Sequence, residues 1–381
     1  MRPAAAPRIA VVHEWLLDFA GSERVVREIL EVLPQADLFT LIDRPDEELR
    51  AAIPRRARAT SFLQSLPRPQ RWLRYYVPLM PLAVKQLDVS AYDIVISSSH
   101  AVAKGVVTRP RQLHLSYVHT PMRYAWELRD EYLRAAGLDR GLRGWAARFV
   151  LERLRRWDVR SASGVDVFLA NSAHVAQRIQ KAYGRDAEVL YPPVDVDAFP
   201  VRETKEDFYL TVSRLEPYKR IDLLVEAFAA RRERRLIIIG SGPEMRRLRS
   251  KATPNVELLG RLPTPEVRDH MQRARAFLFA GIEDFGIVMA EAQACGTPVI
   301  ALARGGAAEI VRDDTGLLFS EQTAEALREA VQRFEQERGR FAAAACRENA
   351  LRFDRRRFRQ RFAELVRSHW EGFAMQGALR S

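Results

Sequence analysis

The feature that most constrains the fold is an alternation of short, apolar, β-branched runs with longer stretches of helical periodicity. Ile9–Val12 is such a run, and Ser22–Leu33 follows it with apolar side chains at helical spacing and Ser22 as the expected N-cap. Near-continuous apolar strands that alternate with helices are typical of a doubly wound parallel sheet. The first half is therefore predicted to be such an α/β domain, with further strands at 93–97, 113–118 and 165–170.

The alternation stops once and then restarts. Residues 191–203 contain three prolines and no helical period, which is typical of a linker. Five more strands are then predicted at 208–212, 236–239, 256–259, 276–279 and 298–301, with helices at 220–230 and 244–252. We predict two doubly wound domains joined near residue 195, followed by an Arg-rich amphipathic helix over Arg352–Trp370.

The net charge of the chain indicates which classes of partner it favours. Lys and Arg number 61 against 49 Asp and Glu, so the net charge of +12 favours nucleic acid, an anionic membrane surface or a phosphorylated ligand. The two cysteines, Cys295 and Cys346, suit a reducing cytoplasm and belong to no zinc-type cluster. No apolar run approaches the ~18–20 residues of a spanning helix, and the N-terminus lacks the apolar core of a signal peptide. We expect a cytoplasmic chain that is soluble or lies on a membrane surface.

Residues that follow a strand are the candidates for chemistry, because ligands of doubly wound sheets bind at the carboxyl ends of the strands. After the strand at 276–279, seven residues separate Glu283 from Glu291, with Gly286 in the turn before a helix. A helix N-terminus suits a phosphate or a sugar oxygen, whereas carboxylates suit neutral hydroxyls. A nucleotide sugar offers both groups. The alternative is a solvated helix start, where acids are favoured by the helix dipole.

A second loop, Ser213–Lys219, follows the strand at 208–212 and carries Arg214 and Lys219. Two cations at a strand end can neutralise a diphosphate, and an Arg guanidinium can bind it in a fork. The alternative is an ordinary basic loop in a basic protein. Together with the glutamate pair, this loop favours a nucleotide sugar as the ligand.

Several motifs in order resemble the retaining glycosyltransferases of family 4, which have the GT-B fold. The resemblance covers nearly the whole chain and rests on Gly21, SRLEPYK at 213–219, Gly240–Pro243, Leu259–Arg261, and the Glu283–Glu291 segment with CGTPVIA behind it. It implies two Rossmann-like domains facing a central cleft, an acceptor-binding one at 1–195 and a nucleotide-sugar-binding one at 196–355. It also implies that a C-terminal helix, 356–381, crosses back to pack on the N-terminal domain.

The resemblance implies roles for individual residues. Arg214 and Lys219 would bind the donor diphosphate, and Gly21 would let the backbone approach these phosphates, because glycine has no Cβ. Glu291 would bind the ribose hydroxyls. Glu283 would bind the donor sugar, with the backbone N–H groups of the following turn nearby.

Other positions complete the implied donor site. Gly260 and Arg261 would lie beside the base, whereas Gly240–Pro243 is interpreted as a tight strand-to-helix turn rather than a phosphate contact. The implied donor-binding set is Gly21, Arg214, Lys219, Gly260, Arg261, Glu283, Asp284, Phe285, Gly286, Ile287, Val288 and Glu291.

Histidines at the ends of N-terminal strands are further candidates. His119 follows the strand at 113–118, where in this family a histidine faces the donor sugar; the alternative is a structural histidine. His13 and Glu14 end the first predicted strand and are candidates for acceptor contact. The implied catalytic set is His119, Glu283, Arg214 and Lys219.

The resemblance implies sugar transfer with retention at the anomeric carbon and without a general enzyme nucleophile. The acceptor would attack the front face of an oxocarbenium-like ion pair, and the leaving diphosphate would accept its proton. Positioning and stabilisation of the leaving charge then carry catalysis. Asp195-Val196-Asp197 has a pattern that binds metal in other glycosyltransferases, but it lies in the predicted linker. We expect no metal and no cofactor besides the donor.

Two further stretches bear on the substrates. His119–Leu128 and Tyr191–Asp195 look like mannosyltransferases of bacterial O-antigen and exopolysaccharide synthesis, which implies GDP-mannose; UDP-glucose and related donors stay open. Pro54–Lys85 is rich in Arg and aromatic residues and suits an anionic membrane surface, or else is a solvated face of the N-terminal domain. The acceptor would be a polyprenyl-diphosphate-linked sugar or an oligosaccharide.

Three rival functions can be stated from the sequence. A nucleic-acid-binding protein would explain the charge, but no recognition helix or stacking sheet is predicted, so we expect no nucleic-acid partner. A nucleotide-sugar epimerase of the same fold class would act on the donor alone. A sugar-nucleotide-binding scaffold would bind without turnover, which the paired cations and glutamates argue against.

Overall fold

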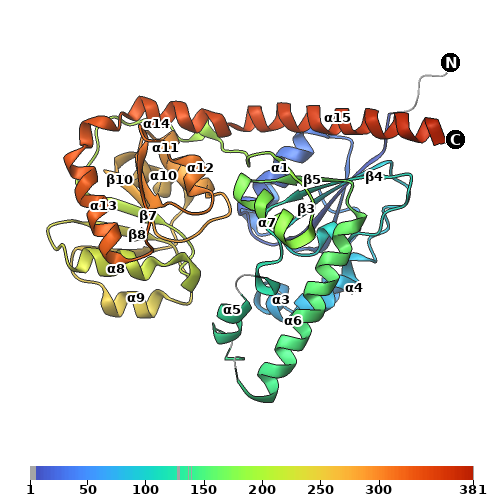
Figure 1. The fold of residues 1–381 in the computed structure, drawn as a ribbon, viewed down its shortest axis with the longest axis horizontal. Helices are drawn as coiled ribbons and strands as arrows, with labels where there is room; N and C mark the ends of the chain where they lie inside the picture. The colour runs from blue at the N-terminus through green and yellow to red at the C-terminus, as the bar shows by residue number, and fades with distance from the viewer. Residues whose placement is uncertain (1–5, 127–128, 136, 139, 381) are drawn as a thin grey trace. The chain divides into compact units, whose positions relative to one another are not determined.

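The computed structural model describes residues 6–126, 129–135, 137–138 and 140–380. It divides into two compact units, the first made of Met1–Tyr191 with Phe358–Ser381 and the second of Pro192–Arg357. Each unit is built on one parallel six-stranded sheet packed by helices (Figure 1). The predicted class of two doubly wound α/β domains is confirmed. Glu127 and Leu128 of the stretch 119–128, and the last residue of the predicted C-terminal helix, lie outside the described residues.

The first unit has strands in the order β2-β1-β3-β4-β5-β6. The strands are β1 (Ile9–Leu16), β2 (Asp37–Asp43), β3 (Ile94–Ser99), β4 (Leu113–Val118), β5 (Val167–Ala170) and β6 (Glu188–Val189). The helices are α1 (Gly21–Val32), α2 (Glu47–Ala52), α3 (Pro69–Tyr76), α4 (Met80–Val84), α5 (Arg129–Ala135), α6 (Gly141–Ser161) and α7 (Ala173–Tyr183). The chain builds outward from β1 to β2 and then from β3 in the other direction, so the strand order reverses between β1 and β3.

The C-terminal helix α15 (Arg355–Arg380) completes the core of the first unit. Phe358, Phe362 and Leu365 are buried in one cluster with residues of β1, β3 and β4. The Phe358 ring lies edge-on to Tyr117 of β4, with ring centroids 6.0 Å apart. The predicted return of this helix to the N-terminal domain is therefore confirmed.

The second unit repeats the plan with strands in the order β12-β11-β10-β7-β8-β9. The strands are β7 (Tyr209–Val212), β8 (Leu236–Ile239), β9 (Val256–Gly260), β10 (Ala276–Phe279), β11 (Val299–Leu302) and β12 (Gly316–Phe319). The helices are α8 (Ile221–Ala229), α9 (Met245–Lys251), α10 (Thr264–Arg273), α11 (Ile287–Ala294), α12 (Ala307–Ile310), α13 (Ala324–Gln336) and α14 (Ala343–Ala350). Here the strand order reverses between β7 and β10.

The predicted N-cap of α1 is wrong. The helix begins at Gly21 after Ala20, and Ser22 lies inside its first turn. Ser22 Oγ donates to Glu23 Oε2 at 3.0 Å, and the same carboxylate oxygen accepts from the Ala20 N–H at 3.2 Å. The Glu23 carboxylate, rather than a serine hydroxyl, therefore satisfies a donor at the helix start.

The stretch predicted as a linker is packed into the second unit from Pro192 onward. Val194 is fully buried and forms a β-bridge with Asp354. Asp195 pairs with Arg355 at 2.9 Å, and Asp197 pairs with Arg356. The prolines here lie in a packed segment, and the two units divide between Tyr191 and Pro192, close to the predicted join near residue 195.

Histidine 114, within β4, makes the stability of the first unit sensitive to acid. Its Nδ1 lies 2.8 Å from the Gly164 carbonyl oxygen and its Nε2 lies 2.9 Å from Ser97 Oγ. Burial lowers the pKa of His114 to about 4. The unfolded chain takes up this proton at higher pH than the folded chain, so stability falls as the pH drops from about 6.5 towards about 4.

We expect this group alone to remove on the order of 2–3 kcal/mol from the free energy of unfolding across that window. Urea unfolding at pH 7 and pH 4.5 measures the change. His114→Gln keeps hydrogen-bonding groups without the titration and should show a smaller loss. The same loss in both proteins would contradict the assignment.

Candidate functional site

The strand-order reversal of the second unit brings together the two loops that the sequence singled out. Ser213–Lys219 follows β7, and residues 280–286 follow β10, its parallel neighbour. Ligands of doubly wound sheets bind at such a reversal. The cationic loop and the glutamate loop therefore share the expected ligand-binding edge.

Lys219 is where the two loops meet. It ends the 3-10 helix Pro217–Lys219 and is buried. Its ammonium pairs with the Glu283 carboxylate and lies 5.2 Å from the centroid of the Tyr218 ring. Arg214 is exposed, and its guanidinium donates to the Tyr218 hydroxyl at 3.1 Å. The loop thus offers one buried and one exposed cation.

The glutamate loop leads directly into α11. Gly286 is the N-cap of this helix and has a φ of +100°, a left-handed conformation that favours glycine. Phe285 is buried against Phe353, with ring centroids 5.1 Å apart. Ile287 and Val288 open the helix, and the first N–H groups of a helix lack partners within it. Two other predicted donor residues are buried nearby in sequence, namely Asp284 and Glu291.

The loop after β11 holds the glutamate loop by main-chain contacts. The Gly306 N–H donates to the Glu283 carbonyl at 2.9 Å, and Gly305 forms a β-bridge with Glu283. A Cβ at Gly306 would lie 2.2 Å from the Phe285 carbonyl oxygen. The sequence analysis missed this glycine pair. Two glycines shortly after a strand were the signal, because they permit close backbone approach.

We expect Gly306→Ala to displace the glutamate loop, because the added Cβ meets backbone atoms that cannot rotate away. Overpacking of this kind costs about 1–3 kcal/mol in the free energy of unfolding. Urea unfolding compares this variant with Gly339→Ala, whose added Cβ meets nothing within 4 Å. If the two variants are equally stable, the packing argument fails.

Gly260 and Arg261 also lie at the carboxyl ends of the strands, but two strands away from the strand that precedes the cationic loop. Gly260 ends β9, the edge strand, which β8 separates from β7. Arg261 is exposed. Residues 240–243 turn between β8 and α9, and Ser241 accepts from the Leu215 N–H of the cationic loop at 2.9 Å. This geometry favours the interpretation of 240–243 as a packed turn.

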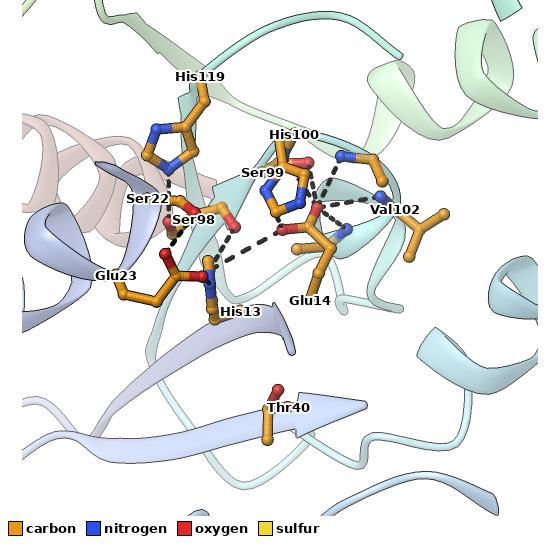
Figure 2. A network of polar contacts seen from close by, with 12 residues as sticks. His13, Glu14, Ser22, Glu23, Thr40, Ser98, Ser99, His100, Val102 and His119 are labelled. Atoms are coloured by element: carbon orange, nitrogen blue, oxygen red, sulfur yellow. Dashed lines mark hydrogen bonds and ion pairs between the residues drawn. The ribbon is translucent and has the colours of Figure 1, made fainter. Parts of the chain in front are cut away.

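A second polar group lies in the first unit, at the reversal between β1 and β3 (Figure 2). His13 and Glu14 belong to β1, His100 follows β3, and His119 follows β4. The ring centroid of His100 lies 5.9 Å from that of His13 and 6.1 Å from that of His119. With Glu23, these side chains form one network.

Glu14 is the anchor of this network. It is fully buried, and its Oε1 accepts from four consecutive backbone N–H groups, His100–Ala103, at 2.8–3.0 Å. Its Oε2 lies 3.1 Å from His100 Nδ1. Burial acts to raise the pKa of Glu14, but His100, His13 and the backbone N–H groups outweigh it and hold the pKa well below its usual range. Glu14 is therefore a carboxylate that fixes the loop after β3.

His119 is neutral in this setting. Burial, followed by the proximity of His100 and His13, lowers the pKa of His119 to about 3. Its Nε2 lies 2.8 Å from Ser98 Oγ, and the Asn171 amide donates to its backbone carbonyl at 2.9 Å. A neutral imidazole at a strand end can hydrogen-bond a sugar hydroxyl without introducing charge.

His13 connects β1 to the start of α1. Its Nε2 lies 3.3 Å from Glu23 Oε1, and its Nδ1 lies 3.2 Å from the Ser98 carbonyl oxygen. Glu23 stands two residues after Gly21, the first residue of α1. Gly21 therefore begins a helix whose first turn is joined to β1 by the contact between His13 and Glu23.

His13 and Glu14, which are predicted to contact the acceptor, lie further inside the fold than the end of a strand would place them. β1 continues to Leu16, so both residues lie inside the strand and are fully buried. The residue that sequence reasoning missed is His100, whose side chain is 22% exposed. Its signal was a polar run, Ser97–His100, at the end of an apolar strand.

Among the residues that the structure describes, no group of three or more His, Cys, Asp or Glu side chains is arranged to hold a metal ion. The carboxylates of the Asp195-Val196-Asp197 pattern are instead paired with arginines of the second unit. Both carboxylates therefore contribute to the packing of this segment within the second unit.

Comparisons with known proteins indicate the family and the fold to which this arrangement belongs. Residues 19–198 match the family described as Glycosyltransferase Family 4, and residues 196–353 match Glycosyl transferases group 1. Sucrose-phosphate synthase from Thermosynechococcus elongatus is structurally similar with a TM-score of 0.74 at 18% identity, covering 96% of this chain and 100% of that one. HepE from Anabaena, solved in complex with UDP, has a TM-score of 0.71 at 19% identity, covering 95% and 100%. These structures show the GT-B fold.

Two curated relatives are more similar in sequence. The GDP-mannose-dependent monoacylated alpha-(1-6)-phosphatidylinositol monomannoside mannosyltransferase of Corynebacterium glutamicum is 35% identical over 186 residues, 40% of this chain and 49% of its own. The GDP-mannose-dependent alpha-(1-6)-phosphatidylinositol monomannoside mannosyltransferase of Mycobacterium tuberculosis is 32% identical over 224 residues, 49% of this chain and 56% of its own. The chain thus spans about half the length of these relatives. With both halves matched in order, the chain belongs to the glycosyltransferases of family 4.

Proposed function

We propose that this chain is a retaining glycosyltransferase that moves mannose from GDP-mannose to a lipid-linked or oligosaccharide acceptor in cell-surface polysaccharide synthesis. The observation that carries the proposal is the pairing of Lys219 with Glu283 at the strand-order reversal of the second unit. A cation suits a diphosphate and a carboxylate suits sugar hydroxyls. A nucleotide sugar combines both groups in one molecule.

The relatives favour GDP-mannose as the donor. Both matched mannosyltransferases are named as GDP-mannose-dependent. The structural neighbour HepE was solved with UDP, and at 19% identity it speaks for the fold alone. A UDP-sugar, which the sequence leaves open, is the alternative donor.

In the proposed reaction, the acceptor hydroxyl attacks the anomeric carbon on the face that the diphosphate leaves. The bond from carbon to the diphosphate oxygen breaks, the glycosidic bond forms, and the acceptor proton passes to the departing diphosphate. Arg214 and Lys219 stabilise the leaving charge, together with the N-terminus of α11. Glu283 and Glu291 accept hydrogen bonds from hydroxyls of the donor. His119 is proposed to orient a sugar hydroxyl, and no metal is required because the cations take its place.

We further propose that the protein acts at the inner face of the cell membrane. Among the described residues, no helix is long and apolar enough to cross a bilayer. In the stretch 54–85, Trp72 and Tyr75 of α3 are exposed, with ring centroids 5.4 Å apart. Arg55 and Arg58, however, serve the fold: Arg55 donates to two backbone carbonyls, and Arg58 pairs with Asp37. Both arginines therefore take part in contacts within the first unit.

A thermal-shift panel tests the donor. GDP-mannose, GDP, UDP-glucose, UDP-N-acetylglucosamine and UDP are each added without metal. A ligand at ~100 times its Kd stabilises the fold by about 2.7 kcal/mol. We expect shifts with GDP-mannose and GDP only. Shifts with the uridine compounds alone would overturn the proposed donor, and no shift with any compound would overturn the proposed site.

Glu291→Ala tests whether this residue belongs to the donor site. Removing a carboxylate that binds ribose hydroxyls costs about 1.5–3 kcal/mol, which weakens GDP-mannose binding by roughly 10- to 100-fold. The matched variant Glu226→Ala, an exposed glutamate of α8, should bind as the parent does. An unchanged affinity for Glu291→Ala would remove this residue from the site.

A further inference from the structure

We propose that α6 is the element that docks this protein on an anionic phospholipid bilayer. Its N-terminal half would enter the apolar boundary of the membrane, while arginines of its C-terminal half bind lipid phosphates. This inference deepens the proposed function, because a lipid-linked acceptor is met at such a surface. It concerns a helix outside the stretch 54–85.

The N-terminal half of α6 presents an exposed apolar face. Leu142, Trp145 and Phe149 are 88%, 68% and 51% exposed. Their spacing of three and four residues places them on one side of the helix. The Trp145 and Phe149 rings stack with centroids 5.9 Å apart. Large apolar side chains gathered on one exposed face mark an interaction site.

The same face becomes basic in the C-terminal half. Arg153, Arg156 and Arg160 continue the helical spacing from Phe149. Arg153 lies over the Phe149 ring at 5.7 Å, which joins the apolar and basic parts of the face. Apolar and aromatic residues beside cationic ones are the pattern of an interfacial helix on anionic lipid.

A shallow, open groove lies beside this basic part. It has a volume of about 550 Å³ and is lined by Trp126, Glu152, Arg155, Arg156, Val159 and Arg160. The lining contains three arginines and one glutamate, and that glutamate accepts from Arg156 Nε at 3.3 Å. The surplus of cationic groups favours an anion. Arginine binds phosphate oxygens in a fork, as a lipid phosphate requires.

The opposite face of α6 is fixed to the first unit. Asp158 is fully buried, pairs with Lys104, and accepts from the Trp126 indole at 2.8 Å and the Tyr183 hydroxyl at 2.9 Å. Figure 1 shows α6 next to α3 and α4 at one side of this unit. α3 and α6 contribute to one hydrophobic cluster, and α3 exposes Trp72 and Tyr75. A helix anchored in this way can carry the attachment of the protein to a bilayer.

Vesicle binding tests the inference directly. Co-sedimentation is measured with phosphatidylglycerol vesicles and with phosphatidylcholine vesicles at low salt. We expect the protein to bind the anionic vesicles. A triple variant with Leu142→Ser, Trp145→Ser and Phe149→Ser should bind at least about tenfold more weakly. Its control carries Val107→Ser, Val201→Ser and Met375→Ser, three exposed apolar residues elsewhere, and should bind as the parent does.

A second pair of variants separates the face from the overall charge. Arg153→Gln, Arg156→Gln and Arg160→Gln together should weaken anionic binding about 100-fold, because each cation near the surface contributes roughly tenfold or less. The control removes three exposed cations from α9, with Arg246→Gln, Arg249→Gln and Lys251→Gln. If the control loses as much binding as the α6 variant, the net charge explains the attraction and the inference is wrong.

A fluorophore at one position reports insertion. Both cysteines of the chain are buried, so a cysteine introduced as Leu142→Cys can be labelled selectively with an environment-sensitive dye. Its emission should shift to the blue on anionic vesicles, whereas a dye at Val107→Cys should not. Concentration-dependent dimers that the apolar triple variant abolishes, without vesicle binding, would assign the face to a second copy instead and overturn the inference.

These readouts are independent of the proposed function. Stabilisation by GDP-mannose is also measured on the α6 variants and should be unchanged, because no residue of α6 belongs to the proposed donor set. Vesicle binding that survives in the apolar triple variant overturns the role of α6, whatever the donor result. Loss of the donor shift in the parent protein overturns the proposed function and leaves the vesicle result standing.

Discussion

We expect that replacing Lys219 with alanine lowers kcat for the proposed sugar transfer by about 100- to 1000-fold, which is the usual effect of removing one preorganised group that stabilises developing charge. Lys219 is held between Glu283 and the rings of Tyr218 and Phe279, so its position is set before a donor binds. The charge on the leaving diphosphate grows in the transition state, and the lost interaction acts mainly there. KM for the donor should therefore change less than kcat.

Steady-state kinetics with the donor found in the thermal-shift panel measures the split between kcat and KM. Lys251→Ala, which removes an exposed cation from α9, is the matched control and should retain the parent kcat. Glu283→Gln tests the partner, because it releases Lys219 without removing its charge. A Lys219→Ala enzyme with the parent kcat would exclude the proposed stabilisation of the leaving group.

We expect that replacing Glu14 with alanine removes about 3–5 kcal/mol from the free energy of unfolding, because it leaves buried groups without their charged partner. Four backbone N–H groups and the Ser99 hydroxyl donate to one carboxylate oxygen, so the loss is concentrated in the loop after β3. Urea unfolding measures the effect, with the exposed Glu371→Ala of α15 as control.

Glu14→Gln keeps the experiment informative if the alanine variant does not fold. The amide oxygen still accepts hydrogen bonds but carries no charge, so a loss of about 2 kcal/mol is expected. Relative to the parent protein, the rate of amide hydrogen exchange should then rise most at residues 100–103. A Gln variant as stable as the parent, with slow exchange there, would show that the carboxylate charge does not anchor this loop.

The sequence predicted best those strands that are buried on both faces. Leu236–Ile239 is β8 over the same residues, because a buried parallel strand is a continuous apolar run. β1 was predicted too short, since His13 and Glu14 resemble the end of a strand. Their partners lie at positions 98–103, and only the folded sheet shows that these polar groups are satisfied within the core.

The candidate site could be predicted in part for a related reason. Lys219 and Glu283 are 64 residues apart in the sequence, yet both follow strands. Because the carboxyl ends of parallel strands lie on one side of a sheet, the two residues are expected on that side. The rule does not reveal that they pair with each other. It also does not reveal Gly306, whose importance depends on a backbone contact with Phe285 that neither segment encodes alone.

The division of the chain has a consequence for biosynthesis. Residues 192–357 form an insertion in the first unit, whose last part, Phe358 onward, supplies Phe358, Phe362 and Leu365 to its core. A ribosome adds about 5–20 residues per second, so these 357 − 191 = 166 residues delay completion of that core by about 10 to 30 s. During this interval the nascent first unit exposes the apolar surface that α15 later covers. The second unit, contiguous in sequence, can finish folding before the first.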